Sequence, residues 1–312
     1  MKATTMTTTI LRCGRGLFRA GLIATLLPAV ALAQDPIPPL PELLFVRIEP
    51  GRTQLGGDRI SYLAAGKSEA PAIVLLHGIG AHAGGFRYQI AALSDTYRVI
   101  AWNAPGYMLS ENLKPDWPKC ADYADVVAAM LDALALRKVY VLGSSLGTMH
   151  AACFAAKYPD RVAKLVLIGT PMGLAGAPEA DVKRALAARE KRILEEGPLL
   201  NAQASMVRLA GLKASPAAKG LMLEMLKAIN RPAYIQAGRM VVDVDMQALA
   251  RAIKAPTLLI HGRDDRNAPL ADAEKLAKLF ADARFVVLDG HGHLPEIEAP
   301  QAVAALLRDF LR

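Results

Sequence analysis

Two glycines and two serines form a short motif in the middle of the chain, GSSLG at residues 143–147, between an apolar run and a stretch of small residues that favours a helix. An ordinary strand-to-helix turn also prefers Gly and Ser, for backbone freedom and local hydrogen bonds. A serine hydroxyl becomes a nucleophile only where a base removes its proton. The motif is therefore compatible with a plain turn or with a nucleophilic serine, and other parts of the chain have to decide between them.

Three more polar clusters follow apolar runs: HGIG at 77–80, HGRDDR at 261–266 and DGHGH at 289–293. In an open α/β sheet, ligands bind outside the carboxyl ends of the strands, so these clusters and GSSLG are expected to lie near one another. The order along the chain is Ser, then Asp, then His. An imidazole can take a serine proton near neutral pH, and a carboxylate can fix the ring tautomer and balance its charge. These residue types therefore suit nucleophilic catalysis.

The pattern around the clusters predicts an α/β fold. Short apolar runs alternate with helical stretches such as ADYADVVAAMLDALAL (121–136) and QAVAALLRDFLR (301–312). Strands this uniformly apolar are buried on both faces, which indicates a mostly parallel central sheet with helices on each side. Before them, LLFVRIEP and RISYLAAG predict an antiparallel hairpin. The runs expected to form the other strands are AIVLLHG, RVIAWN, VYVLGS, KLVLIGT, PTLLIHG and RFVVLDG.

A long interval without a convincing strand interrupts this alternation between Thr170 and Pro256. It contains helical patches, including ADVKRALAAREKRILEE and GLMLEMLKAIN. We therefore predict a core made of residues 43–171 and 255–312, with residues 172–254 as a helical cap at the carboxyl edge of the sheet. The alternative is a set of packing helices that extend the core and gate nothing.

Residues 1–33 have the pattern of a secretory signal peptide. Basic residues precede the apolar run AGLIATLLPAVALA, which ends in ALA at 31–33, with small residues at both positions that a signal peptidase reads,. A membrane-spanning helix is the alternative, but it needs about 20 apolar residues, and this run of about 14 is interrupted by Pro28. We expect cleavage before Gln34, a Pro-rich linker at 34–42, and a periplasmic or secreted protein with no stable membrane insertion.

The net charge of +8 at first suggests a nucleic-acid or anionic membrane partner,. Half of this charge comes from Lys2, Arg12, Arg15 and Arg19, which would leave with the signal peptide. We therefore predict a small-molecule substrate and no nucleic-acid partner.

Two cysteines would remain after cleavage, Cys120 and Cys153. Exported proteins can form disulfides. Cys153, however, lies among small apolar residues in AACFAA, which is typical of a buried packing residue,. We predict no disulfide between these two residues.

Taken together, the four polar clusters resemble those of the α/β-hydrolase superfamily, over essentially all of the chain from about residue 43. GSSLG is similar to that family's nucleophile elbow, HGIG to its oxyanion loop, GRDDRNAP to its acid loop and GHGHLPEIEAP to its histidine loop,. The resemblance implies that Ser145 is the nucleophile, Asp265 the orienting acid and His293 the base. It also implies that the backbone N–H groups of Ile79 and Leu146 form the oxyanion hole.

Neighbouring residues are expected to have lesser roles. Glycines flank the serines because a side chain at 143 or 147 would collide with the backbone of the sharp turn. Ser144 is expected to be a small turn residue, and Asp264 a loop residue. The chain departs from the family in NAPGYMLS (103–110), where Asn103 replaces an acid and Met108 replaces a glycine in a loop that borders the pocket of relatives.

The other histidines are expected to be structural. His77 and His261 each precede a glycine at a strand end, where a ring nitrogen can bond to loop backbone. A metal site at His291 and His293 is not expected, because no third ligand of suitable spacing accompanies them.

We therefore predict a serine hydrolase that cleaves a carboxylic ester or lactone of an apolar small molecule through an acyl-enzyme, without a metal or organic cofactor. One alternative is a carbon–carbon bond hydrolase of the meta-ring-fission type, against which export argues because such metabolites arise in the cytoplasm. A second is a non-catalytic ligand-binding homologue, because fold alone does not imply activity. Loss of a triad member would indicate this last alternative, and none is lost.

Overall fold

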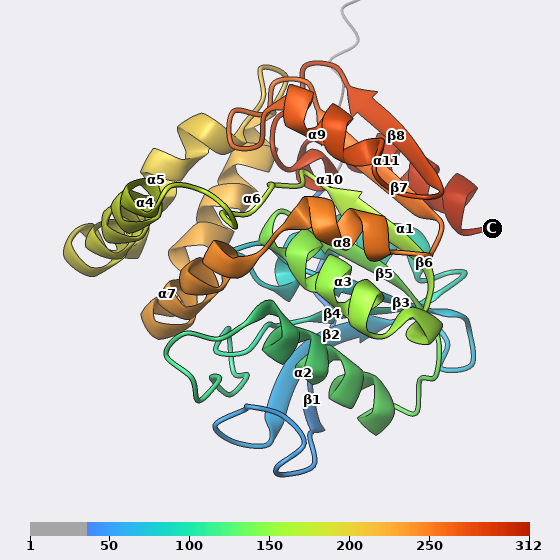
Figure 1. Cartoon of the computed structure of the whole chain (residues 1–312). Helices are drawn as coiled ribbons and strands as arrows, with labels where there is room; N and C mark the ends of the chain where they lie inside the picture. Colours follow the sequence, from blue (N-terminus) through green and yellow to red (C-terminus); the bar gives the residue numbers. More distant parts are fainter. Residues whose placement is uncertain (1–35) are drawn as a thin grey trace, which may run out of the picture. The chain divides into compact units, whose positions relative to one another are not determined.

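An eight-stranded sheet runs through residues 36–312, the part of the chain that the computed structural model describes (Figure 1). Its strands are β1 (Leu43–Arg47), β2 (Arg59–Ala65), β3 (Ala72–Leu76), β4 (Arg98–Trp102), β5 (Val139–Ser144), β6 (Val162–Ile168), β7 (Thr257–Gly262) and β8 (Ala283–Leu288). They lie in the order β1-β2-β4-β3-β5-β6-β7-β8. β1 and β2 form an antiparallel hairpin, β2 is antiparallel to β4, and the strands from β4 to β8 along the sheet are parallel. The predicted hairpin and mostly parallel sheet are confirmed.

Helices cover both faces of the sheet. They are η1 (Ala83–Phe86), α1 (Arg87–Leu93), α2 (Cys120–Ala133), α3 (Leu146–Lys157), η2 (Pro159–Arg161), α9 (Leu270–Ala277), α10 (Pro295–Glu298) and α11 (Pro300–Leu311). Side chains alternate between the two faces of a strand, so Val74 and Leu76 of β3 pack in the layer of α2, α3 and α9, whereas Ile73 and Leu75 pack in the layer of α1 and α11,. Every residue of β3 is buried, and each buried Leu or Ile side chain contributes about 1.5–3 kcal/mol. This double burial explains why the central strands are uniformly apolar.

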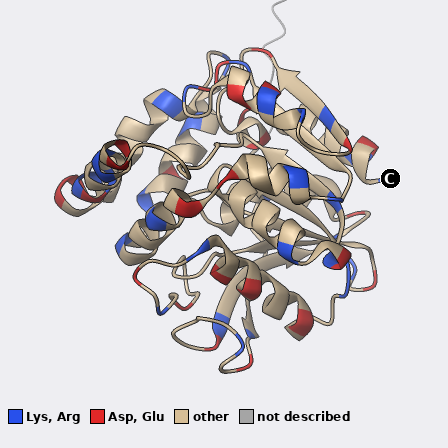
Figure 2. Cartoon of the chain, in the orientation of Figure 1, with Lys and Arg blue, Asp and Glu red and all other residues tan. Residues whose placement is uncertain are grey.

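The insertion between β6 and β7 is helical, as the sequence predicted. It consists of α4 (Glu179–Lys191), η3 (Arg192–Glu196), α5 (Gly197–Leu209), α6 (Pro216–Lys227), α7 (Arg231–Met240), η4 (Val241–Asp243) and α8 (Met246–Ala252). α4 buries no residue, but its first turn is acidic and its last turn is basic, which favours a helix through the helix dipole,. Figure 2 shows this mixture of Lys, Arg, Asp and Glu residues on α4. α8 packs against α3 and α9 of the core, and α6 packs against η1 and α10.

The N-terminal predictions are only partly covered by the described residues. The predicted signal peptide, residues 1–33, lies outside them. Residues 36–42 of the predicted linker have no regular secondary structure, and the carbonyl of Pro38 accepts a hydrogen bond from Arg87 over 3.4 Å. Over residues 36–312, no helix has the length and apolar character needed to span a bilayer.

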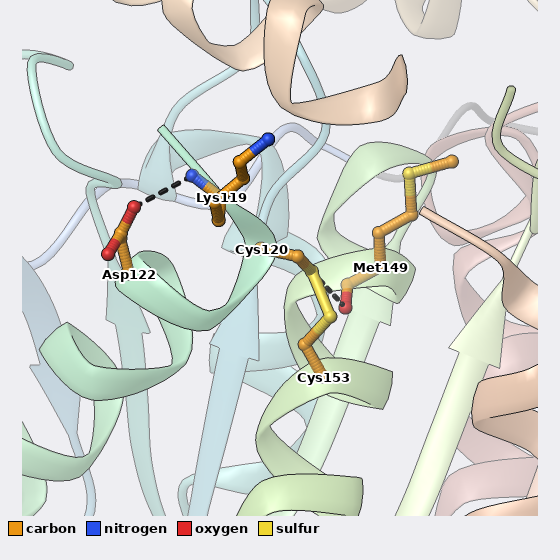
Figure 3. The surroundings of a disulfide bond; sticks show 5 residues. All are labelled: Lys119, Cys120, Asp122, Met149 and Cys153. Atoms are coloured by element: carbon orange, nitrogen blue, oxygen red, sulfur yellow. Dashed lines mark hydrogen bonds between the residues drawn. A yellow bond between two sulfur atoms is a disulfide. The ribbon is translucent and has the colours of Figure 1, made fainter. Parts of the chain in front are cut away.

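Cys120 and Cys153 form a disulfide, so the prediction of no disulfide is wrong (Figure 3). Cys120 is the first residue of α2 and Cys153 lies in α3, two helices that pack side by side with a Cα–Cα distance of 6.2 Å between the cysteines. The apolar residues around Cys153 correctly indicated burial. They could not indicate that the neighbouring helix places a second sulfur against it, because that depends on how α2 docks on α3.

Candidate active site

Ser145 lies in the sharp turn between β5 and α3, with φ 52° and ψ −121°. A residue with a side chain seldom adopts this backbone conformation, which costs about 1–3 kcal/mol. The flanking glycines make the turn possible: a Cβ on Gly143 would lie 2.2 Å from the carbonyl oxygen of Gly147, and a Cβ on Gly147 would lie 1.9 Å from that of Leu76. The predicted steric reason for both glycines is confirmed, and Ser145 is the residue that the turn projects.

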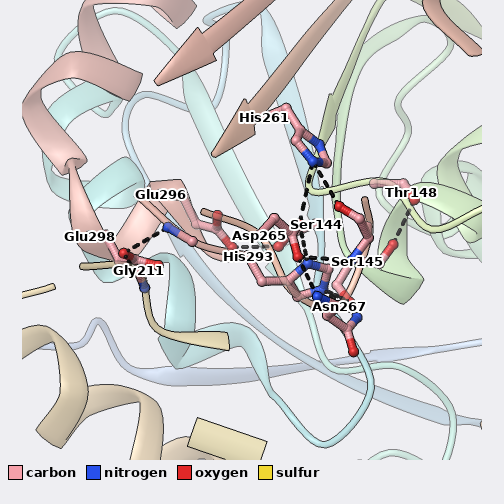
Figure 4. A network of polar contacts seen from close by, with 12 residues as sticks. Ser144, Ser145, Thr148, Gly211, His261, Asp265, Asn267, His293, Glu296 and Glu298 are labelled. Carbon is pink, nitrogen blue, oxygen red and sulfur yellow. Dashed lines mark hydrogen bonds and ion pairs between the residues drawn. The ribbon is translucent and has the colours of Figure 1, made fainter. Parts of the chain in front are cut away.

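Ser145, His293 and Asp265 form one chain of hydrogen bonds (Figure 4). The Oγ of Ser145 lies 2.7 Å from Nε2 of His293, and Nδ1 of His293 lies 2.7 Å from Oδ2 of Asp265. All three side chains are buried, and they come from loops after β5, β8 and β7. Since an ionised carboxylate can only accept, Nδ1 carries the ring proton and Nε2 is left to accept from the serine hydroxyl. The ring is thus in the tautomer that can deprotonate Ser145.

Asp265 is held in its ionised form. Burial acts to raise its pKa, but hydrogen bonds from His293 and from the backbone N–H groups of Ala268 and Asn267 outweigh burial and lower the pKa. Asp264 points elsewhere, and its Oδ2 accepts a hydrogen bond from the N–H of Leu212 over 3.2 Å. Only Asp265 of this adjacent pair contacts the imidazole.

The backbone of His293 is tied to the insertion. Its N–H donates to the carbonyl of Leu209, the last residue of α5, over 2.8 Å. Nearby, Oε2 of Glu298 accepts from the N–H groups of Gly211 and Gly292 at 3.0 Å each. The position of the imidazole therefore depends on the helices of the insertion as well as on the sheet.

His77 and His261 bond to loop backbone, as predicted. Nε2 of His77 accepts from the N–H of Ala104 over 3.0 Å, so its Nδ1 donates to the carbonyl of Gly78 over 2.8 Å. Burial lowers the pKa of His77 to about 3, which keeps the ring neutral. Nε2 of His261 lies 2.9 Å from the carbonyl oxygen of Ala268. Among residues 36–312, no group of three or more His, Cys, Asp or Glu side chains is placed to hold a metal ion.

Ile79 and Leu146 line the same cavity as Ser145 and His293. The N–H of Leu146 opens α3, where the first four N–H groups of a helix lack an intrahelical acceptor and the helix dipole favours negative charge,. Ile79 follows Gly78, at which a Cβ would lie 2.9 Å from Cβ of Ser145, so this loop passes directly beside the serine. Both N–H groups are thus carried by segments that adjoin the reacting oxygen.

The loop 103–110, which departs from the family pattern, forms hydrogen bonds with segments that adjoin the site. Asn103 is buried, accepts from the N–H of Ala83 over 2.8 Å and donates to Oγ of Ser61 over 3.0 Å. The hydroxyl of Tyr107 accepts from the N–H of Gly80 over 3.3 Å. Met108, at the family's glycine position, keeps a left-handed backbone with φ 49°. The amide of Asn103 therefore joins this loop to η1 and to β2, and these partners could not be predicted from the sequence.

A cavity of about 520 Å³ opens above Ser145 between the sheet and the insertion. Apolar side chains of Met172, Met225 and Leu226 form part of its wall. The polar part of the insertion wall was not predicted from the sequence, and it includes Arg189, Arg192, Asn201, Ser205 and Arg208.

The three arginines of this wall lie close enough to affect one another. Burial, together with the charges of Arg192 and Arg189, lowers the pKa of Arg208. Within the described part of the chain, none of the three forms an ion pair with a carboxylate. No periodicity in the sequence marks them, because α4, η3 and α5 must fold together before their side chains share a cavity.

Two further polar side chains near the triad were not anticipated. Nδ2 of Asn267 lies 3.2 Å from Nε2 of His293, the nitrogen that also faces Ser145. The hydroxyl of Ser144 donates to Oε1 of Glu296, so Ser144 is more than the small turn residue that the sequence predicted. Both contacts join segments far apart in the sequence, which is why local patterns did not reveal them.

A serine, an imidazole and a carboxylate bonded in this order, at the carboxyl end of a parallel sheet, define a serine-type hydrolase. Residues 71–193 match the model of the alpha/beta hydrolase fold, and residues 238–312 match that of TAP-like proteins. The chain belongs to the α/β-hydrolase family.

Similar proteins differ in the bond that they hydrolyse. The 2-hydroxy-6-oxo-6-phenylhexa-2,4-dienoate hydrolase of Comamonas testosteroni is 31% identical over 264 residues, which are 81% of this chain and 91% of that protein. The malate-bound structure of a thermophilic esterase from Thermogutta terrifontis has a TM-score of 0.75 and 26% identity, covering 86% of this chain and 98% of that one. The enol-lactonase of Burkholderia xenovorans LB400 has a TM-score of 0.74 and 25% identity, covering 83% and 98% of the two chains.

Proposed function

We propose that this protein hydrolyses a carbon–carbon bond in a small anionic ketone of the 2-hydroxy-6-oxo-dienoate class. The observation that carries the proposal is the juxtaposition of the Ser145–His293–Asp265 chain with three arginines in one cavity, none of which forms an ion pair with a carboxylate of residues 36–312. The curated relative from Comamonas testosteroni, which acts on such a compound, supports it. The prediction of an ester or lactone substrate thus becomes the second candidate.

The functional groups of a 2-hydroxy-6-oxo-dienoate determine which bond is hydrolysed and which side chains can bind it. A 2-hydroxy-6-oxo-dienoate contains no ester or amide, so its hydrolysis must break the bond between C5 and the carbonyl carbon C6. It also carries a carboxylate at C1, and guanidinium groups bind carboxylates through paired N–H donors. Arg189, Arg192 and Arg208 carry such donors and line the cavity together with the apolar Met225 and Leu226.

The triad would carry out this hydrolysis in two stages. Ser145 gives its proton to His293 and attacks C6, while the N–H groups of Ile79 and Leu146 stabilise the oxyanion. The C5–C6 bond then breaks in the 2-oxo tautomer, and its electron pair passes through C4 and C3 to the oxygen on C2. His293 returns the proton to this enolate. Water, deprotonated by His293, finally attacks the acyl group and releases a carboxylic acid and Ser145.

An ester or enol-lactone substrate is the second candidate. It is supported by the similarity to the Thermogutta terrifontis esterase and to the Burkholderia xenovorans enol-lactonase. The same triad and oxyanion groups would serve. The leaving group would be an oxygen atom, so no carbanion or enolate has to be expelled by breaking a carbon–carbon bond. The signal-like residues 1–33 also favour this candidate, because meta-ring-fission metabolites arise in the cytoplasm.

Turnover of matched substrates tests the proposal. We expect kcat/KM for a 2-hydroxy-6-oxo-dienoate to exceed that for p-nitrophenyl esters and enol-lactones. Arg208→Ala should lower kcat/KM for the anionic ketone about 10- to 100-fold, the value of one charge-assisted hydrogen bond, and should leave a neutral p-nitrophenyl ester within about twofold. Arg184→Ala, at an exposed residue of α4 that pairs with Asp181, is the control. Faster turnover of the ester or lactone by the wild-type protein would reject the carbon–carbon hydrolase in favour of the second candidate.

We also propose that the chain is exported and cleaved near Ala33. The Cys120–Cys153 disulfide supports this, because disulfides persist in oxidising compartments,. We expect intact mass spectrometry of exported protein to give a chain that begins near Gln34 and has no free thiol.

Since the two cysteines are 33 residues apart, reduction should lower the free energy of unfolding by about 3–4 kcal/mol in urea titrations,. A chain that keeps Met1, or a urea midpoint unaffected by reductant, would contradict these expectations.

A further inference from the structure

Glu296 is a buried carboxyl group beside the triad that the proposed mechanism does not use (Figure 4). It lies in α10, three residues after His293, with 3% of its surface exposed. Its Oε1 accepts the hydroxyl of Ser144, the residue directly before the proposed nucleophile. Its Oε2 is buried and has no hydrogen-bond partner within residues 36–312. Glu296 also contributes to the lining of the cavity above Ser145.

The position of Glu296 is fixed by its surroundings. Its backbone carbonyl accepts from Nε2 of Gln89 in α1 over 2.8 Å, which holds α10 against the core. Leu294, two residues before it, and Ile297, the next residue, pack with Met222 and Met225 of α6 in an apolar cluster. A carboxyl group without a full set of partners is costly in such a place, especially when charged. Packing alone therefore does not explain a carboxyl group at this position.

The charges that act on Glu296 come from two neighbours. Burial raises its pKa to about 7, the hydrogen bond from Ser144 and the charge of His293 act to lower it, and Glu298 acts to raise it further. Of the other elements packed against α10, α1 contributes the amide of Gln89, and α6 contributes Met222 and Met225. The charged residues of α11, Arg308 and Asp309, form ion pairs with Asp95 and Arg284. His82, at the start of η1, has its pKa lowered by burial and stays neutral. His261 in β7 is likewise kept neutral by burial, which lowers its pKa.

We propose that Glu296 is a positioning residue of this active site, which braces the turn beneath Ser145 through Ser144 and supports the positive charge that forms on His293. The proposal rests on the proposed roles of Ser145 and His293 as nucleophile and base. When Ser145 is attacking, His293 becomes an imidazolium, and a second carboxylate beside it stabilises that ion in the same sense as Asp265 does. A neutral Glu296 can brace the turn but cannot supply the charge.

This role has a definite dependence on pH. At acid pH Glu296 is protonated and the site lacks its charge, whereas above neutral pH the carboxylate forms and the reaction of Ser145 becomes faster. The ionisation of Glu296 therefore contributes a step to the acid limb of the rate profile. Glu296→Gln keeps a group that can accept from Ser144 but never ionises, so its profile should lack this step and reach a plateau lower by about fivefold to tenfold.

The rate at which a fluorophosphonate labels Ser145, measured against pH, tests the proposal without requiring the natural substrate. In Ser144→Ala, Glu296 loses the donor that favours its ionised form, so the upper step of the profile should move to higher pH. In Glu296→Gln that step should disappear. Glu224→Gln makes the same change at an exposed residue of α6 that pairs with Lys227, and its profile should match the wild type.

Three results would overturn the proposal. Superimposable profiles for wild type and Glu296→Gln would show that the carboxylate has no electrostatic role. A uniform loss of rate at all pH values would show that Glu296 only fills space. If the wild-type protein is not labelled at Ser145 at any pH, both the proposed function and this inference fail. The first two results reject the inference alone, so the two kinds of failure can be distinguished.

A second measurement covers the case in which Glu296→Gln does not fold. In wild-type protein labelled with ¹³C-glutamate, one side-chain carboxyl should titrate near neutral pH, and its midpoint should change when Ser145 is phosphonylated. Titration of every glutamate close to the ordinary value of about 4.3 would overturn the proposal.

Discussion

Ser145→Ala is expected to lower kcat by about 10⁴- to 10⁶-fold while the protein stays folded. In the proposed mechanism His293 deprotonates the hydroxyl of Ser145, and among residues 36–312 no other oxygen forms a hydrogen bond with Nε2. The residual rate would come from binding and from the N–H groups of Ile79 and Leu146. Steady-state kinetics on the best substrate, with melting temperature as a check on folding, measure both quantities.

Ser144→Ala is the matched control, because it removes a hydroxyl from the adjacent residue of the same turn. Its side chain bonds to Glu296 rather than to His293, so we expect a loss of no more than about tenfold,. A well-folded Ser144→Ala protein with no activity, beside an active Ser145→Ala protein, would place the nucleophile one residue earlier than the geometry does.

The fold could be predicted because the sequence carries its physical cause locally. A strand buried on both faces must be apolar at every position, which β3 satisfies from Ala72 to Leu76,. Gly143 and Gly147 were equally readable, since a backbone oxygen occupies the space of any side chain at either position. The motif that turns the chain sharply is also the motif that exposes Ser145, so fold and candidate nucleophile were predicted from the same residues.

The remaining parts of the site depend on packing between segments far apart in the sequence. Asn267 approaches His293 across two loops, and Glu296 meets Ser144 over a separation of 152 residues. The pairing of Cys120 with Cys153 likewise needs the docking of α2 on α3. Residue type alone assigns each of these an ordinary role, because their partners are defined only by the folded chain.

Substrate class was the least predictable property for a chemical reason. The triad activates a serine toward a carbonyl carbon, and that step is common to esters, lactones and ketones. The bond that breaks afterwards depends on the group that leaves and on how the cavity binds it. In the proposed function Arg189, Arg192 and Arg208 bind the substrate carboxylate, and they come together only in the folded insertion.

The adjacent carboxylates Asp264 and Asp265 provide the other large expected effect. Asp265→Asn should lower kcat by about 10⁴-fold with the fold intact. An asparagine oxygen can still accept from the N–H groups of Asn267 and Ala268, which bond to Oδ1 of Asp265. The amide nitrogen would then face Nδ1 of His293 and donate to it. This would move the ring proton to Nε2, where it faces Ser145 and prevents proton transfer.

Asp264→Asn should change kcat by less than about threefold, because its contact is a single hydrogen bond of 3.2 Å from the N–H of Leu212 in the insertion,. The pKa of Asp265 is lowered because hydrogen-bond donors hold its carboxylate. Its ionised form therefore stabilises the fold fully at pH values above the ordinary Asp pKa of about 3.9, and this contribution is lost as the pH falls through the lowered pKa. The pH dependence of melting temperature should therefore change in Asp265→Asn and persist in Asp264→Asn. Kinetics and melting curves of both variants decide the assignment: an inactive, well-folded Asp264→Asn protein beside an active Asp265→Asn protein would mean that the carboxylate orienting His293 is the other one.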